Sequence, residues 1–153
     1  MTHEEKARGL FLQGYNCAQS VFAAFAEDMG MTERQAVRMA CGFGGGLGGR
    51  REMCGAVNAM VMAYGVLRGY DEPNNTELKA KHYAEVRELA ERFEAQFGTC
   101  SCRKLLGLDE NVKVLEPSER TQAYYETRPC PNLAAGAAAI LDAWLREHPQ
   151  EEK

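Results

Sequence analysis

The feature that most constrains this chain is a glycine-rich stretch followed closely by an apolar run. Residues 41–49 read CGFGGGLGG, and six of these nine residues are glycine. Glycine adopts left-handed backbone conformations that a Cβ disfavours, so we expect a loop that other groups approach closely. The run Met53–Leu67 is almost wholly apolar and predicts a buried central helix. Cys54 then falls in the first turn of that helix, where backbone amides favour a thiolate.

Length and charge limit the classes of protein to consider. The 153 residues fit one domain, 1–153, that buries a core without disulfide bonds. The formal net charge is −4, and the basic residues are scattered rather than clustered. We therefore expect neither a nucleic-acid partner nor binding to an anionic membrane surface. The run at 53–67 is shorter than the roughly 20 residues that span a bilayer, so we expect no membrane insertion.

The cysteine count points to chemistry when it is combined with the expected compartment. The charged start, Met1 to Arg8, does not resemble a signal peptide, so we expect a cytoplasmic protein. Six cysteines in a reducing compartment favour metal binding, catalysis or redox sensing over structural disulfides. The count alone does not choose among these.

Helix signals recur along the chain, and no strand alternation of useful length is present. Capping patterns and apolar spacings of three and four residues predict an all-α fold, a single-domain multi-helix bundle around the central helix. The expected helices cover residues 2–13, 17–29, 32–40, 53–68, 76–97, 102–106, 117–125 and 130–147. An irregular connection is expected over 108–118.

Four cysteines that are far apart in sequence each fall at an expected helix start. They are Cys17, Cys54, Cys102 and Cys130, with Cys130 expected as the N-cap of the last helix. Converging helix starts would stabilise thiolates or the anionic sulfurs of a metal cluster. Free cysteine also packs as a small hydrophobe, and from the pattern alone function and packing weigh about equally.

The remaining cysteines and the glycines carry weaker signals. Cys41 continues an amphipathic helix and is expected to pack, whereas a bond between Cys100 and Cys102 would close a small, strained ring. The amides of Gly44, Gly45 and Gly46 could form an anion nest, with Arg50 and Arg51 adding positive charge, although a tight packing turn explains them equally well. Asn58 lies one helical turn beyond Cys54, on the same face, where it could orient a ligand or satisfy a buried polar group.

Several separated motifs together resemble the family named Putative redox-active protein (C_GCAxxG_C_C). The matching pieces are GYNCAQ at 14–19, GFGGG at 42–46, CGA at 54–56, CRKLLG at 102–107 and finally Cys130. The resemblance implies a small helical protein with four characteristic cysteines, which map to the same four positions at expected helix starts. The family's CGAxxG motif ends in glycine, whereas this chain has Ala59 there.

Three hypotheses follow. The leading one is a redox protein, with a thiol-dependent oxidoreductase among its forms, in which converging thiolates exchange disulfides or electrons with an unknown redox partner. Cys54 would be the most activated, with Cys17, Cys102 and Cys130 as resolving thiols. In the second, the same four cysteines hold an iron-sulfur cluster or a single zinc or iron, although no CxxC, CxxCH or helical His pair is present. In the third, the cysteines only pack within a non-catalytic binding module.

Overall fold

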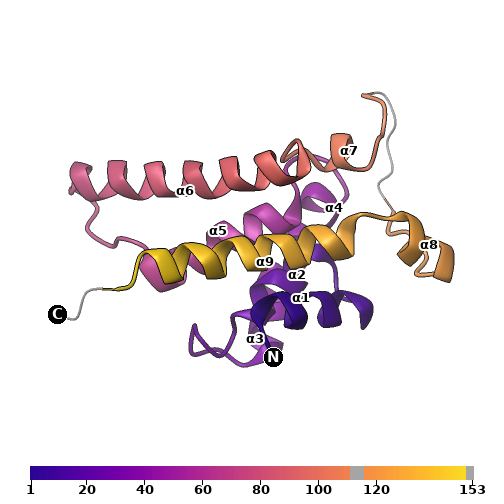
Figure 1. Cartoon of the computed structure of the whole chain (residues 1–153), viewed down its shortest axis with the longest axis horizontal. Helices are drawn as coiled ribbons and strands as arrows, with labels where there is room; N and C mark the ends of the chain where they lie inside the picture. The colour runs from indigo at the N-terminus through magenta and orange to yellow at the C-terminus, as the bar shows by residue number, and fades with distance from the viewer. Residues whose placement is uncertain (111–115, 151–153) are drawn as a thin grey trace.

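The apolar run forms the central helix α5, Gly55–Arg68, as the sequence predicts. It packs against α2 (Cys17–Ala24), α9 (Cys130–Glu147) and α6 (Thr76–Phe97). The computed structural model describes residues 1–110 and 116–150. Figure 1 shows the two long helices, α6 and α9, running across the molecule with α5 beside them. The central helix is therefore enclosed by helices that lie far apart in sequence.

The other helical segments are shorter. They are α1 (His3–Leu12), α3 (Glu33–Ala40), the 3₁₀ turn η1 (Cys41–Phe43), α4 (Gly44–Leu47), α7 (Cys102–Leu105) and α8 (Gln122–Thr127). Within residues 1–110 and 116–150 there is no strand, and extended pairing is limited to one antiparallel bridge between Met53 and Ser101. The predicted all-α, single-domain fold is confirmed.

Local capping chemistry explains where several helices begin. The side chains of Thr2 and Thr32 each accept a hydrogen bond from the backbone amide three residues later. The side chain of that later residue accepts a hydrogen bond from the threonine's own backbone amide, which completes a capping box. Asn16 caps α2 in the same way, with Gln19 as its partner. The starts of α1, α2 and α3 therefore lie where the capping patterns predicted them.

Several boundaries differ from the expectation. Helix α2 ends at Ala24 rather than near residue 29, because the next amides bond three residues back and tighten the chain out of the α-helix. Asn75, not Thr76, caps α6. The segment expected to turn helical at 117 begins its helix only at 122, where Thr121 provides the cap. Of the connection expected over 108–118, residues 111–115 lie outside the described residues.

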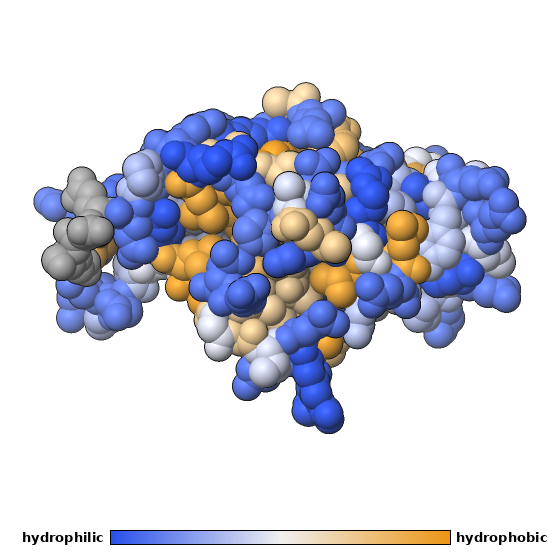
Figure 2. Space-filling model, turned by 60° about the horizontal axis from the view of Figure 1, so that its bottom comes forward, coloured by the Kyte–Doolittle hydropathy of each residue, from blue (hydrophilic) through white to orange (hydrophobic). Residues whose placement is uncertain are grey.

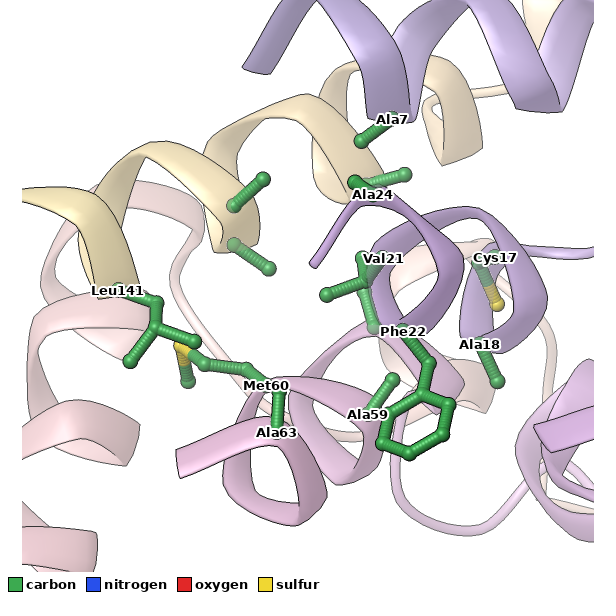
Figure 3. Close-up of a cluster of buried hydrophobic side chains, with 14 of the residues drawn as sticks. Ala7, Cys17, Ala18, Val21, Phe22, Ala24, Ala59, Met60, Ala63 and Leu141 are labelled. Carbon is green, nitrogen blue, oxygen red and sulfur yellow. The ribbon is translucent and has the colours of Figure 1, made fainter. Parts of the chain in front are cut away.

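The core between α2, α5 and α9 is built largely from alanine. Ala18, Ala59 and Ala63 are fully buried, and larger side chains such as Phe22 and Met60 fill the spaces between them. Figure 3 shows these side chains directed into one cluster, with the Cys17 sulfur at its edge. Small side chains let the helix backbones approach closely, and this close approach brings several helix starts to one end of the bundle.

The glycine-rich segment is a tight turn packed against its own chain. Gly45 and Gly46 have left-handed backbones inside the short helix α4, with φ of 63° and 65°. A Cβ on Gly46 would lie 2.6 Å from the Glu52 amide nitrogen and 2.7 Å from the Cys102 Cβ. The close approach expected from the sequence is therefore made by residues 51–52 and by α7.

Among the described residues, no helix has the length and apolar character needed to cross a bilayer. Figure 2 shows hydrophobic residues between hydrophilic ones on one face of the molecule.

Candidate active site

The four cysteines at helix starts line one cavity of about 60 Å³. Cys17 and Cys102 are the first residues of α2 and α7. Cys54 is the N-cap of α5 rather than a residue of its first turn, and Cys130 is the first residue of α9 after the cap Pro129. Figure 1 shows α4, α7 and the start of α9 toward the same end of the bundle. The structure thus brings together cysteines that span more than a hundred positions of sequence.

Backbone pairing fixes Cys54 relative to Cys102. The Cys54 amide donates to the Cys100 carbonyl over 2.7 Å, and the Cys102 amide donates to the Glu52 carbonyl over 2.7 Å. These two bonds flank the bridge between Met53 and Ser101. The short ladder holds the start of α5 beside the start of α7, so the spacing of these two cysteines does not depend on side-chain contacts.

Close backbone approach places Cys17 against the start of α5. A Cβ on Gly55 would lie 2.9 Å from the Cys17 sulfur and 2.6 Å from the Phe43 carbonyl oxygen. The Asn16 side-chain amide also donates to the Cys41 carbonyl over 3.1 Å, which ties the start of α2 to the glycine-rich segment. Only glycine at position 55 leaves room for this arrangement.

Cys17 carries the most stabilised thiolate of the site. The Cys54 thiol hydrogen-bonds to the Cys17 sulfur, and backbone amides of Ala18, Ala56 and Gly45 add to it. These bonds outweigh burial and lower the pKa of Cys17 from 9.0 to about 7. The same hydrogen bond, with burial, raises the pKa of Cys54 well above 9.0. The sequence favoured Cys54 as the most activated cysteine, whereas the directions of these two pKa shifts favour Cys17.

Cys102 and Cys130 are neutral neighbours of this pair. Burial raises the pKa of Cys102, although the Arg51 guanidinium partly opposes the shift, and burial together with the charge of Cys17 raises the pKa of Cys130 to about 11. The negative charge of Cys17 contributes to both upward shifts, as expected for sulfurs within electrostatic reach of one another. At neutral pH Cys17 is therefore the cysteine of the cavity with the largest thiolate fraction.

Three arginines complete the wall of the cavity. Arg51 is only 8% exposed, has a left-handed backbone with φ of 58°, and its Nη1 lies 3.9 Å from the Cys102 sulfur. A non-glycine residue in this conformation is strained and is often found at functional sites. Arg120 and Arg128 also line the cavity. The sequence pattern singled out Arg51 but missed the other two, because they come from a segment without regular periodicity.

A larger groove adjoins the cavity. It has a volume of about 530 Å³ and shares six lining residues with the cavity: Asn16, Gly45, Arg51, Arg120, Tyr124 and Arg128. Gly44 also lines the groove, whereas Gly46 is buried behind it and Asn58 is half-buried and lines neither space. Cys41 is exposed at the groove, so the expectation that it packs in the core is wrong: its helix ends there and its side chain faces outward.

One of the three glycines expected to form an anion nest acts on Cys17. The Gly45 amide is one of the donors that stabilise the Cys17 sulfur. The glycine-rich segment therefore contributes to thiolate stabilisation through Gly45 and to packing through Gly46.

The cysteines do not form a metal-binding set in this arrangement. Across residues 1–110 and 116–150, no three or more His, Cys, Asp or Glu side chains are placed to hold one metal ion. A tetrahedral zinc or an iron-sulfur cluster would need four sulfurs at bonding distance from the same centre or cluster. The four cysteines would have to move to bind such a group.

A sequence model of the family named Putative redox-active protein (C_GCAxxG_C_C) matches residues 15–144. The chain belongs to this family. No match was found among curated proteins or among solved structures. The match includes all four cysteines of the cavity, and the family's description as redox-active agrees with a site made of cysteines. The glycine of the family motif is replaced by Ala59, which is fully buried in α5 and does not line the cavity.

Proposed function

We propose that this member of the C_GCAxxG_C_C family is a dithiol redox protein in which Cys17 is the nucleophile and Cys54 the resolving thiol. The observation that carries the proposal is that Cys17 and Cys54 line one small cavity, where the start of α5 closely approaches the Cys17 sulfur. The Cys54 thiol is also the largest cause of the lowered pKa of Cys17. A thiolate is the reactive form of cysteine, and one with a pKa near ambient pH combines availability with nucleophilicity.

The reaction is a two-electron thiol–disulfide exchange. The Cys17 thiolate attacks one sulfur of a substrate disulfide, forms a mixed disulfide and releases the first substrate thiolate. Cys54 then loses its proton to that leaving thiolate and attacks the Cys17 sulfur. The second substrate thiolate leaves, and a Cys17–Cys54 disulfide remains. The substrate is reduced by two electrons and the protein is oxidised by two.

The site supports each step of this exchange. Both sulfurs belong to one cavity of about 60 Å³, and the start of α5 beside Cys54 closely approaches the Cys17 sulfur, so the two thiols are near enough to form a disulfide. The amides of Ala18, Ala56 and Gly45 stabilise negative charge on Cys17 before attack and again if it becomes the leaving group. Cys102 and Cys130 line the same cavity, and their action as further resolving thiols is part of the proposal.

Disulfide mapping tests the proposal directly. The reduced protein is treated with a small neutral disulfide, digested under acid conditions and analysed by mass spectrometry. We expect a Cys17–Cys54 bond that forms reversibly and is lost in Cys17→Ser and Cys54→Ser. Cys100→Ser is the matched control, because Cys100 is equally buried, lies outside the cavity and has a pKa raised to about 11.

Two other outcomes would replace the proposal. Stoichiometric zinc or iron, with or without acid-labile sulfide, after anaerobic purification would make the four cysteines ligands, and thiols protected until chelation would support this reading. Thiols that remain inert to every small oxidant would instead identify a non-catalytic module with packed cysteines.

A further inference from the structure

Two cations face the cysteine site without a carboxylate to neutralise them. Arg120 and Arg128 line both the cavity and the groove, and neither forms an ion pair with any of the described residues. The described lining of the cavity contains no acidic residue, and that of the groove contains only Glu116. In a chain with a net charge of −4, this is a local concentration of positive charge.

Arg120 is held rigidly at this position. Its guanidinium donates to the carbonyls of Phe11 and Tyr15 over 3.2 and 3.0 Å. It also lies 4.2 Å from the centre of the Phe11 ring and 4.9 Å from that of Tyr124. These contacts fix the orientation of the side chain and leave its full charge in place, because none of the partners is anionic.

Arg128 contacts the same tyrosine as Arg120. Its guanidinium lies 5.0 Å from the centre of the Tyr124 ring, and one nitrogen donates to the Ser118 hydroxyl over 2.8 Å. A guanidinium has five N–H donors, so most of its hydrogen-bonding capacity remains after this single bond. Fixed guanidinium groups recognise carboxylates through paired hydrogen bonds.

We infer that the substrate of the dithiol is a low-molecular-weight anionic disulfide, whose carboxylates face Arg120 and Arg128 while its sulfur–sulfur bond reaches Cys17. This inference rests on the proposed function. The groove of about 530 Å³ has the size of a small-molecule site, and the cavity beyond it is only about 60 Å³. Cys17 is 9% and Cys54 3% exposed, so a slender substrate reaches them where a folded protein surface does not.

The chemistry balances with this substrate alone. One anionic disulfide enters and two anionic thiols leave, after the Cys17 thiolate and then Cys54 have attacked as described above. The carboxylates take no part in electron transfer. Their role is to hold the disulfide in the groove, so the arginines act as binding residues and not in the exchange itself.

A series of disulfides that differ in charge tests the inference. Reduced protein is mixed at low ionic strength with dithiodiglycolate, which is anionic, with 2-hydroxyethyl disulfide, which is neutral, and with cystamine, which is cationic. The rate of Cys17–Cys54 disulfide formation is measured for each. We expect the anion to react at least about tenfold faster than the cation, with the difference shrinking as salt is added.

Variants then assign the preference to the groove. We expect Arg128→Gln to lower the anion-to-neutral rate ratio severalfold and Arg128→Lys to retain part of it. The ratio is used because a change in Cys17 reactivity affects both oxidants alike and cancels. Arg87→Gln on α6 removes the same charge from an exposed position outside the groove, and it should leave the ratio unchanged.

The outcomes separate this inference from the proposed function. Equal rates for the three disulfides, or a faster cation, with a Cys17–Cys54 bond formed in each case, would overturn the anionic substrate and leave the dithiol intact. Absence of that bond with all three oxidants would overturn the dithiol itself. If Arg128→Gln does not fold, the unaltered protein still decides whether the substrate is anionic, through the dependence of its reaction rate on disulfide charge and on salt.

Discussion

The titration of Cys17 tests the electrostatic argument for the site most closely. With a pKa of about 7, half of Cys17 is thiolate at pH 7, whereas a thiol with a pKa of 9.0 would be about 1% thiolate. The thiolate fraction is therefore about fifty times that of an ordinary cysteine. A pKa difference of this size corresponds to about 3 kcal/mol of preferential stabilisation of the thiolate.

The ultraviolet absorbance of the thiolate, followed as pH is raised, measures this fraction without requiring a reagent to enter the cavity. The spectrum of Cys17→Ser is subtracted from that of the unaltered protein, so the remaining transition belongs to Cys17 and to groups coupled to it. We expect this transition near pH 7.

Substitution of Cys54 shows where the stabilisation comes from. The Cys54 thiol is the largest cause of the lowered pKa, so Cys54→Ala should move the Cys17 transition upward toward 9.0. Cys54→Ser retains a donor and should move it less. A transition near 9.0 in the unaltered protein, or one that Cys54→Ala leaves in place, would refute the assignment of Cys17 as the thiolate.

The remaining predictions concern packing, access and pH. Gly55→Ala should destabilise the protein and displace the Cys17 sulfur, because the new Cβ would lie 2.9 Å from that sulfur. Gly65→Ala in the same helix should stabilise the protein by about 0.5–1 kcal/mol, because its Cβ would meet nothing within 4 Å. Urea unfolding measures the change in stability of both variants. A bulky maleimide should label exposed Cys41 rapidly and buried Cys17 and Cys54 slowly in the native protein, as peptide mapping would show. The free energy of unfolding should rise between pH 7 and 9 by up to about 2–3 kcal/mol, because the folded state has released the Cys17 proton in this range and the unfolded state still binds it; this gain should be absent in Cys17→Ser.

The helices were predictable because their signals are local. Capping side chains such as Thr2, Asn16 and Thr32 act within three residues, and the apolar run of α5 is continuous in sequence. The boundaries that differed depend on wider context. The early end of α2 follows from tightened hydrogen bonds around Phe25, which no single residue signals.

The sequence placed the four cysteines at helix starts, but it predicted neither that these starts converge nor how charge is distributed among the sulfurs. A helix start favours a thiolate at each of Cys17, Cys54, Cys102 and Cys130, so position along the chain does not rank them. The ranking arises from three-dimensional contacts: amides from three separate segments meet at Cys17, while burial dominates at Cys102 and Cys130. The sequence favoured Cys54 only because its expected helix start adjoins the glycine-rich stretch, whereas these contacts favour Cys17.

The glycines connect the fold to this chemistry. Gly55 lets the start of α5 approach the Cys17 sulfur, and Gly46 lets the turn approach α7 beside Cys102. A side chain at either position would separate the helix starts and weaken the hydrogen bonds that hold negative charge on Cys17. The same close packing leaves a cavity of only about 60 Å³ around the sulfurs, so the feature that activates the thiolate also restricts which oxidants reach it. In the proposed function, reactivity and selectivity for small substrates therefore have one structural cause.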